Sequence, residues 1–395
     1  MRAPRRLAVV MGALLVAALW GPSSAAAAAA PFLMTADRPG AVPSGHNWSF
    51  DDFFPRTFSV HRDRVLAISV QGFHTATLLP KGMTVAQDRN LNRGMRVDSD
   101  DTTRNPNGTR KAALEIAPLL PTSFSCGGAS NPCPFDGKSI VSSGLPMGPG
   151  AFYVKVTAPV GTYAFLCRVH PGMSGAMTVV GAAAHATSET ERRAKVVAQL
   201  RADRHDGFAA EAAASTAAVH RNADGTRTWL LTAGTGTVHT AVLEMLPRNV
   251  NIRKGDTVAW RTPEINEPHT VTFPDEQFTD LQPKCEEGGG VDSFATPTVF
   301  PPSSPFDFGC GGPPPTRPAD EIELGGGNGV RTIANTSTIS DSGWLQSHAM
   351  DTALHLPFDA ARALWSVRFT NAVPGTYHYM CQVHGDGMSG TIVVH

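Results

Sequence analysis

The chain has 395 residues, of which 42% are hydrophobic and only 17% are charged, and its formal net charge at pH 7 is -1. This length and apolar content are enough for two medium-sized domains with buried cores. Gly (38) and Pro (31) are spread through the chain, which favours short strands and turns over long helices. A nearly neutral chain without a long basic run is not expected to bind nucleic acid through phosphate contacts.

The N-terminal 30 residues have the pattern of a secretory signal peptide. Three arginines precede an apolar stretch over residues 7–20, and small residues that offer cleavage sites follow it. The apolar stretch is too short for a comfortable membrane span, and no later stretch is long and apolar enough. We therefore predict that residues 1–30 are a signal peptide and that the protein is secreted or periplasmic after its removal, without stable membrane insertion.

The rest of the chain repeats itself. The segment APVGTYAFLCRVHPGMSGAMTVV, residues 158–180, is matched by NAVPGTYHYMCQVHGDGMSGTIVVH, residues 371–395. Upstream, residues 53–80 and 244–274 are related in the same way, and a long insert follows each of them. The repeat predicts two homologous domains and a linker, with boundaries at residues 31–182, 183–224 and 225–395.

The repeated segments alternate apolar and polar residues with a period of two. Phe152, Val154 and Val156 share one face, and Gly161 supplies the turn that follows. Short alternating strands at close spacing are typical of antiparallel sandwiches. We predict an all-β fold of two antiparallel Greek-key β-sandwiches joined by a partly helical linker.

The predicted linker, residues 183–224, is rich in Ala, Glu and Arg. Ser188 and Glu191 fit a capping box at the start of a helix. We expect this helix to be interrupted near Gly207 and to act as a solvated spacer.

The six cysteines fall into two kinds. Four lie in the inserts, two in each half, and an exported chain can form disulfides. The remaining two, Cys167 and Cys381, occupy matching positions of the repeat and stay unpaired. The predicted disulfides are Cys126–Cys133 and Cys285–Cys310.

Each half contains the same four residue types in the same order: a His, and far downstream a Cys, a His and a Met within one short loop. Two imidazoles and a thiolate with a weak thioether are the ligand set of a blue-copper electron-transfer site. All positions are filled by protein, so no position remains for a substrate. The candidate metal ligands are His74, Cys167, His170 and Met173 in the first half and His269, Cys381, His384 and Met388 in the second.

On these motifs both halves resemble cupredoxins, the plastocyanin/azurin family of blue copper proteins. The resemblance covers the ligand loops, the upstream histidines and the flanking strands, but not the inserts. It implies one type 1 copper per domain, with Met173 and Met388 as axial ligands, and single-electron transfer to a redox partner protein rather than enzymatic catalysis. The His-to-Met spacing in the first half resembles the amicyanin type, and the longer spacing in the second lies between the common lengths.

Two other functions use related copper chemistry. Two-domain multicopper oxidases and nitrite reductases need further copper held by extra histidines, typically beside the ligand Cys. The ligand cysteines here have Leu166 and Arg168, or Met380 and Gln382, as neighbours, and the sequence has no His-x-His pair. A copper carrier usually has exposed Met and His clusters, whereas the methionines of this chain are scattered. Both alternatives are disfavoured by these patterns.

Overall fold

The structure is a computed structural model that describes residues 30–92, 95–97, 112–115, 117–146, 150–276, 284–285, 321–323, 327–356, 358–370 and 372–395. The predicted signal peptide lies outside these residues apart from Ala30. From Pro31 onward, the described residues belong to one compact unit.

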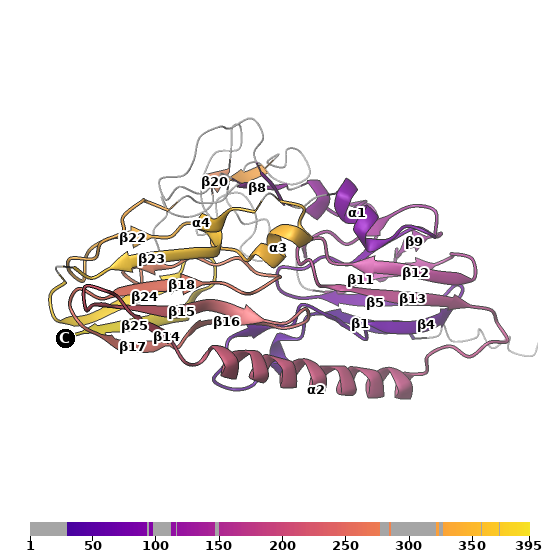
Figure 1. Ribbon diagram of the computed structural model, residues 1–395. Coiled ribbons are helices and arrows are strands. Elements are labelled where there is room, and N and C mark those ends of the chain that lie inside the picture. The colour runs from indigo at the N-terminus through magenta and orange to yellow at the C-terminus, as the bar shows by residue number, and fades with distance from the viewer. Residues whose placement is uncertain are drawn as a thin grey trace, which may run out of the picture. The chain divides into compact units, whose positions relative to one another are not determined.

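The first half folds into two five-stranded sheets (Figure 1). The first sheet has the strand order β3 (Phe53–Phe54), β1 (Phe32–Ala36), β5 (Val65–Val70), β11 (Phe152–Val156), β9 (Cys133–Phe135). The second has the order β10 (Val141–Ser142), β6 (Thr77–Leu78), β12 (Gly161–Leu166), β13 (Ser174–Val180), β4 (Thr57–His61).

The second half also has two sheets. One has the order β2 (Trp48–Ser49), β16 (Ala241–Leu246), β15 (Arg227–Gly236), β18 (Thr257–Arg261), β23 (Leu364–Arg368), with β14 (Ala218–Arg221) also paired to β15. The other has the order β17 (Asn249–Ile252), β25 (Gly385–Val394), β24 (Gly375–Cys381), β19 (Thr272–Phe273), β22 (Ser340–Asp341).

The all-β prediction is confirmed, and each half buries a core that takes side chains from both of its sheets. In β11 the period of two is visible, because Val154 and Val156 are buried while Lys155 between them is exposed. The sheets are mixed rather than purely antiparallel, since β1 pairs with β5, and β15 with β18, in parallel. Alternation marks which face of a strand is buried but does not identify the strand beside it, so the prediction of purely antiparallel pairing does not hold.

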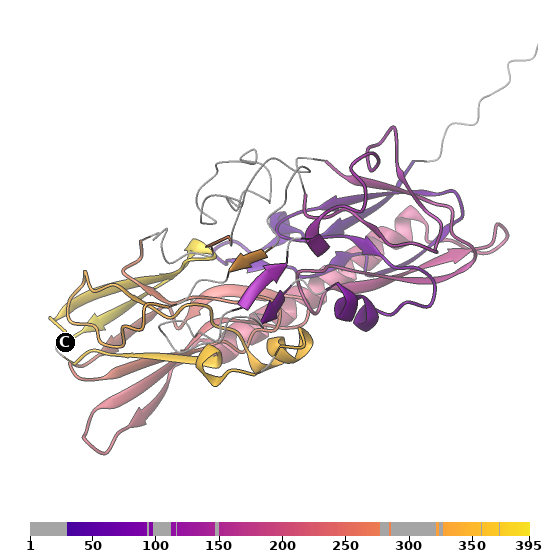
Figure 2. The same ribbon diagram turned by 90° about the horizontal axis from the view of Figure 1, so that it is seen from above.

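One long helix, α2 (Glu189–Ala214), follows the first half and packs against β3, β15 and β16 (Figure 1, Figure 2). It begins with the capping box of Ser188 and Glu191. The expected interruption near Gly207 is wrong, because the helix continues through this residue. A Cβ at position 207 would lie 2.9 Å from the Trp48 ring and 3.0 Å from Thr240, so glycine allows close packing here.

Strands of the first half also pair with strands of the second. Strand β2 belongs to the first half in sequence, yet Trp48 pairs with Val242 of β16 at the edge of a second-half sheet. In the inserts, β8 (Ala112–Glu115) pairs with β7 (Met95–Val97) and with β21 (Glu321–Glu323), which pairs with β20 (Lys284–Cys285). The remaining helices are α1 (Val85–Leu91), α3 (His348–Ala353), α4 (Ala360–Ala363), η1 (Pro39–Ala41) and η2 (Ala117–Leu119).

Candidate metal centres

In the first half, three of the predicted ligands meet at one end of the sandwich. His74 lies in the loop between β5 and β6, Cys167 directly follows β12, and His170 lies in the turn before β13. The Cys167 Sγ is 3.9 Å from His74 Nδ1 and 3.7 Å from His170 Nδ1, and the two Nδ1 atoms are 2.8 Å apart. All three side chains are buried, so the repeat places a closed set of two nitrogens and one sulfur.

The second half builds the same arrangement. His269 precedes β19, Cys381 ends β24, and His384 lies in the turn before β25. The Cys381 Sγ is 3.4 Å from His384 Nδ1, and this nitrogen is 3.2 Å from His269 Nδ1. His269 and Cys381 are fully buried, whereas the His384 side chain is 12% exposed. The second set of donors is therefore the one nearer to solvent.

The two loops are tied together by the same backbone contacts in both halves. The Thr75 N–H donates to Cys167 Sγ at 3.3 Å, and the Thr270 N–H donates to Cys381 Sγ at 3.3 Å. Each threonine hydroxyl in turn accepts from the N–H that follows the cysteine, at 2.9 Å from Arg168 and 2.7 Å from Gln382. The residue after each upstream His thus fixes the sulfur, because it ties the His loop to the Cys loop.

The two predicted axial methionines are fully buried in the same cores as the cysteines. Met173 closes its loop, since its carbonyl accepts from the Cys167 N–H at 3.0 Å. Met177 lies opposite Tyr163 in the strand register, as Ile392 lies opposite Tyr377, which places Met177 in the core. Ligation by Met173 and Met388 stays a prediction.

The surroundings of the thiols favour the thiolate form. Burial alone raises the pKa of Cys167, but hydrogen bonds and charges from His170 and His74 outweigh it and hold the pKa well below its ordinary value. The pKa of Cys381 is lowered well below its ordinary value in the same way, by His384 and His269. A thiolate is the form that ligates a metal.

The donor atoms of each set lie within 4.8 Å of one another, close enough together to hold one metal ion. Bonds of about 2.0 Å to nitrogen and 2.3 Å to sulfur in a trigonal plane would hold the ligand atoms about 3.5–3.8 Å apart. The sulfur–nitrogen distances to His170 and His384, 3.7 Å and 3.4 Å, lie at or near this range. The nitrogen–nitrogen distances of 2.8 Å and 3.2 Å are somewhat shorter. Two imidazoles and a thiolate suit copper.

Sequence reasoning missed a carboxylate that contacts both sets. Glu267 Oε1 lies 2.9 Å from His170 Nε2, and Glu267 Oε2 lies 3.7 Å from His384 Nε2. Burial lowers the pKa of both histidines, but Glu267 helps to raise that of His170 well above its ordinary value and, together with the Cys381 charge, that of His384 to about 10. The only signal in the sequence was an acidic residue two positions before His269, where the first half has Gly72 at the matching position.

Two further clusters place carboxylates beside a histidine. Asp51 is fully buried beside His170 and Glu267, and burial raises the pKa of this carboxyl to about 6. Elsewhere, His46 Nδ1 lies 2.8 Å from Glu211 on α2 and 3.7 Å from Glu244 on β16. Neither group was visible in the sequence, because its members come from distant segments without a shared motif.

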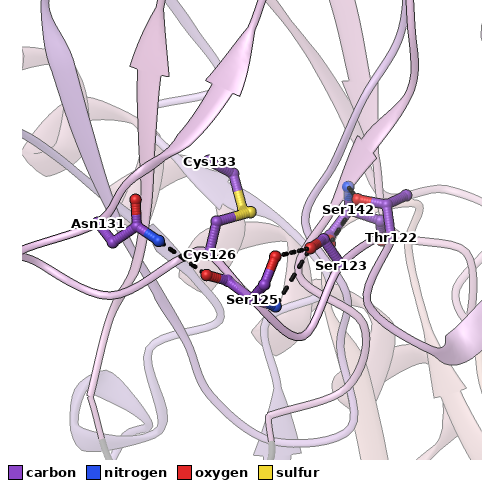
Figure 3. Close-up of a disulfide and its surroundings, with 7 residues drawn as sticks. All are labelled: Thr122, Ser123, Ser125, Cys126, Asn131, Cys133 and Ser142. Atoms are coloured by element: carbon purple, nitrogen blue, oxygen red, sulfur yellow. Dashed lines mark hydrogen bonds between the residues drawn. A yellow bond between two sulfur atoms is a disulfide. The ribbon is translucent and has the colours of Figure 1, made fainter.

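The predicted Cys126–Cys133 disulfide is present, and Figure 3 shows it beside the hydrogen bond from Asn131 Nδ2 to the Ser125 carbonyl, at 2.7 Å. Cys167 and Cys381 are free and buried, as predicted. The predicted Cys285–Cys310 disulfide lies outside the residues whose side chains the structure describes.

The comparisons with known proteins return solved copper proteins. No family model and no curated protein matches the chain. A reduced amicyanin variant is 16% identical over 46% of this chain and 93% of its own, with a TM-score of 0.16. A copper-containing nitrite reductase from Thermus scotoductus SA-01 is 13% identical over 88% of this chain and 62% of its own, with a TM-score of 0.18. A blue copper oxidase from Nitrosomonas europaea is 12% identical over 92% and 85%, with a TM-score of 0.17.

Proposed function

We propose that this protein carries two type 1 copper centres, one in each half, and transfers single electrons. The observation that carries the proposal is the duplication: each half brings a buried free thiol and two imidazole Nδ1 atoms together, with the same threonine N–H on the sulfur. When bound, copper supplies the one-electron couple. The chain holds the donors in a buried, hydrogen-bonded frame, which limits rearrangement when the charge of the centre changes.

The redox partner is proposed to be a protein that docks at the second half. His384 is the ligand with measurable exposure, 12%, whereas His170 is 1% exposed. His384 is therefore the candidate ligand that a docked partner would contact directly. An exported location is consistent with the Cys126–Cys133 disulfide, because disulfides persist in oxidising compartments. Among the helices that the structure describes, none is long and apolar enough to cross a membrane.

The enzyme alternative requires further copper-binding histidines. Within the described residues, no group of possible ligands contains more than two histidines. The full ligand set of a trinuclear centre is therefore not assembled in that part of the chain.

Copper loading and visible spectroscopy test the proposal. The purified chain should bind two coppers and show an intense blue thiolate band. Cys167→Ser and Cys381→Ser should each remove one copper and about half of the band, while the core control Met177→Leu should keep both.

Three results would contradict the proposed function. Copper uptake without the band would identify a carrier. Oxygen consumption with a phenolic donor, or turnover of nitrite, would identify an enzyme.

A further inference from the structure

The loop that carries Glu267 is docked onto the ligand loop of the other half. Asn266 Oδ1 accepts from the Gly172 N–H at 2.9 Å, and Gly172 lies between His170 and Met173. A Cβ at position 172 would lie 2.9 Å from Asn266 Oδ1 and 2.3 Å from the carbonyl oxygen of Val238 in the β15–β16 turn, so only glycine allows this close approach. Residues of the second half therefore contact the loop that carries the donors of the first half.

Hydrogen bonds within the second-half loop fix the position of Glu267. Glu264 is fully buried, and its Oε1 accepts from the backbone N–H groups of Ile265 and Asn266 at 3.0 Å and 2.8 Å. Asn266 also donates to the Val238 carbonyl at 3.0 Å. These bonds hold the loop, so that the Glu267 side chain, 14% exposed, points between the two histidines.

The two rings present the same edge to Glu267. In His170 and His384 the Nδ1 atom faces the cysteine and the other histidine, which leaves Nε2 for the carboxylate. Contacts behind a metal-bound histidine are known to tune the metal through the ring. One carboxylate therefore serves two centres, and it is 0.8 Å closer to the first, at 2.9 Å against 3.7 Å.

We propose, on the basis of the proposed function, that Glu267 couples the two centres, so that the redox state of one changes the electron affinity of the other. The two carboxylate oxygens are shared unequally, because Oε1 lies 2.9 Å from His170 Nε2 while Oε2 lies 3.7 Å from His384 Nε2. The centre that carries the higher charge draws the carboxylate toward its own histidine, and the other centre loses part of that stabilisation. Oxidation of one centre thus makes oxidation of the other harder, and by linkage the effect is equal in both directions.

Each centre still gains or loses one electron, supplied or removed by a redox partner or, in a titration, by a one-electron mediator. No bond is made or broken in the chain. Glu267 acts as a positioning residue, through the two histidines. The expected coupling is about tenfold in the equilibrium constant, which corresponds to about 59 mV for a one-electron couple.

A redox titration of the full copper-loaded protein, followed at the blue band, tests this coupling. Cys381→Ser leaves only the first centre and Cys167→Ser only the second, so these two variants give the uncoupled potentials. The wild-type titration curve should be broader than the sum of the two single-site curves. The extra width should correspond to about a tenfold change in the equilibrium constant, or about 59 mV in potential. In Glu267→Gln, which keeps the volume but removes the charge, the excess should largely disappear, and in Glu267→Ala completely.

A matched control removes a carboxylate from one centre only. Asp37 Oδ2 lies 3.9 Å from His74 Nε2 in the first half, so Asp37→Asn should shift the first potential and leave the coupling unchanged. A wild-type curve equal to the sum of the single-site curves would overturn the proposal, and so would excess breadth that survives in both Glu267 variants. The proposed function fails differently, because no blue band would form in the wild type at all.

Discussion

The two candidate centres have the same donor residues but differ in the groups that contact the upstream histidines. In the first half, the Nε2 edge of His74 faces the Asp37 carboxylate at 3.9 Å. In the second half, the Nε2 of His269 has no hydrogen-bond partner among the described residues and lies against the backbone of Gly234 in β15. The donor set is therefore common to both halves, while the surrounding contacts that tune and hold it have diverged.

The loops that carry the cysteines are also braced differently. Arg168 forms a two-pronged ion pair with buried Asp88, and Arg89 donates to the His170 carbonyl at 3.1 Å. At the matching position of the second half, Gln382 donates to the Glu276 carbonyl at 2.8 Å. At this position the first loop has a buried ion pair, whereas the second has a hydrogen bond between neutral groups. One repeat can thus keep its candidate ligands while the contacts beside them change.

The largest effect is expected from adding a methyl group behind the upstream histidines. In Gly234→Ala the new Cβ would lie 1.9 Å from His269 Nε2, whereas in Gly72→Ala it would lie 3.3 Å from Asp37 and 3.4 Å from His74. Both glycines have positive φ, so each substitution costs about 1–2 kcal/mol of backbone strain. Gly234→Ala should also displace His269 and abolish copper binding in the second half alone.

Metal analysis and the blue band measure this difference. Gly234→Ala should bind one copper and keep about half of the band, while Gly72→Ala should bind two. If Gly234→Ala retains two coppers, the second histidine is not held by this contact, and the contrast between the two centres is lost.

Much of the centres could be predicted from the sequence because their donors lie in a repeated motif. The short Cys-His-Met loop follows a strand of clear alternation, and the upstream His sits at the matching point in each half. The structure brings the His and Cys donors together in both halves. A repeat read twice in one chain is a strong signal, since chance matches do not recur in the same order.

The supporting residues could not be predicted, for a physical reason. Gly234 lies in a strand 35 positions before His269, and only the packing of β15 against the loop shows why a side chain is excluded there. Strand β2 pairs across the halves, and its two residues are too few to indicate which sheet they join. Contacts between distant segments depend on the three-dimensional arrangement, which local periodicity does not encode.

A smaller effect is expected from making the first loop resemble the second. Arg168 is 6% exposed and Asp88 is fully buried, with Nη2–Oδ1 and Nε–Oδ2 distances of 2.7 Å and 3.0 Å. Arg168→Gln would remove the ion-pair partner of the buried Asp88 carboxylate and should lower the free energy of unfolding by about 3 kcal/mol. Denaturant unfolding of the metal-free chain measures this loss.

The double variant with Arg168→Gln and Asp88→Asn is the control, because it removes both charges. It should recover most of the lost stability, since neither partner is then left charged and buried. If the double variant is as unstable as the single one, the Arg168 side chain acts through packing, and the two loops do not differ in the way described.

The smallest effect is expected at the two methionines, and it is the one that decides whether both centres have the same axial ligand. Met173 follows His170 by three positions, whereas Met388 follows His384 by four and lies in the register shift of β25, between Gly385 and Ser389. Leu fits a buried Met site at a cost below about 1.5 kcal/mol, so both variants should fold and bind copper.

An axial thioether is a weak, long ligand that tunes the redox potential. Met173→Leu should therefore keep the blue band and raise the potential of the first centre, because an apolar side chain compensates the charge of the oxidised ion less. Met388→Leu should do the same in the second centre. Titration of each variant in the matching single-site chain, with Met177→Leu as the core control, measures the shift. A potential that moves with Met173→Leu but not with Met388→Leu would mean that the extra loop residue carries the second sulfur away from the metal, and that the two halves share three ligands rather than four.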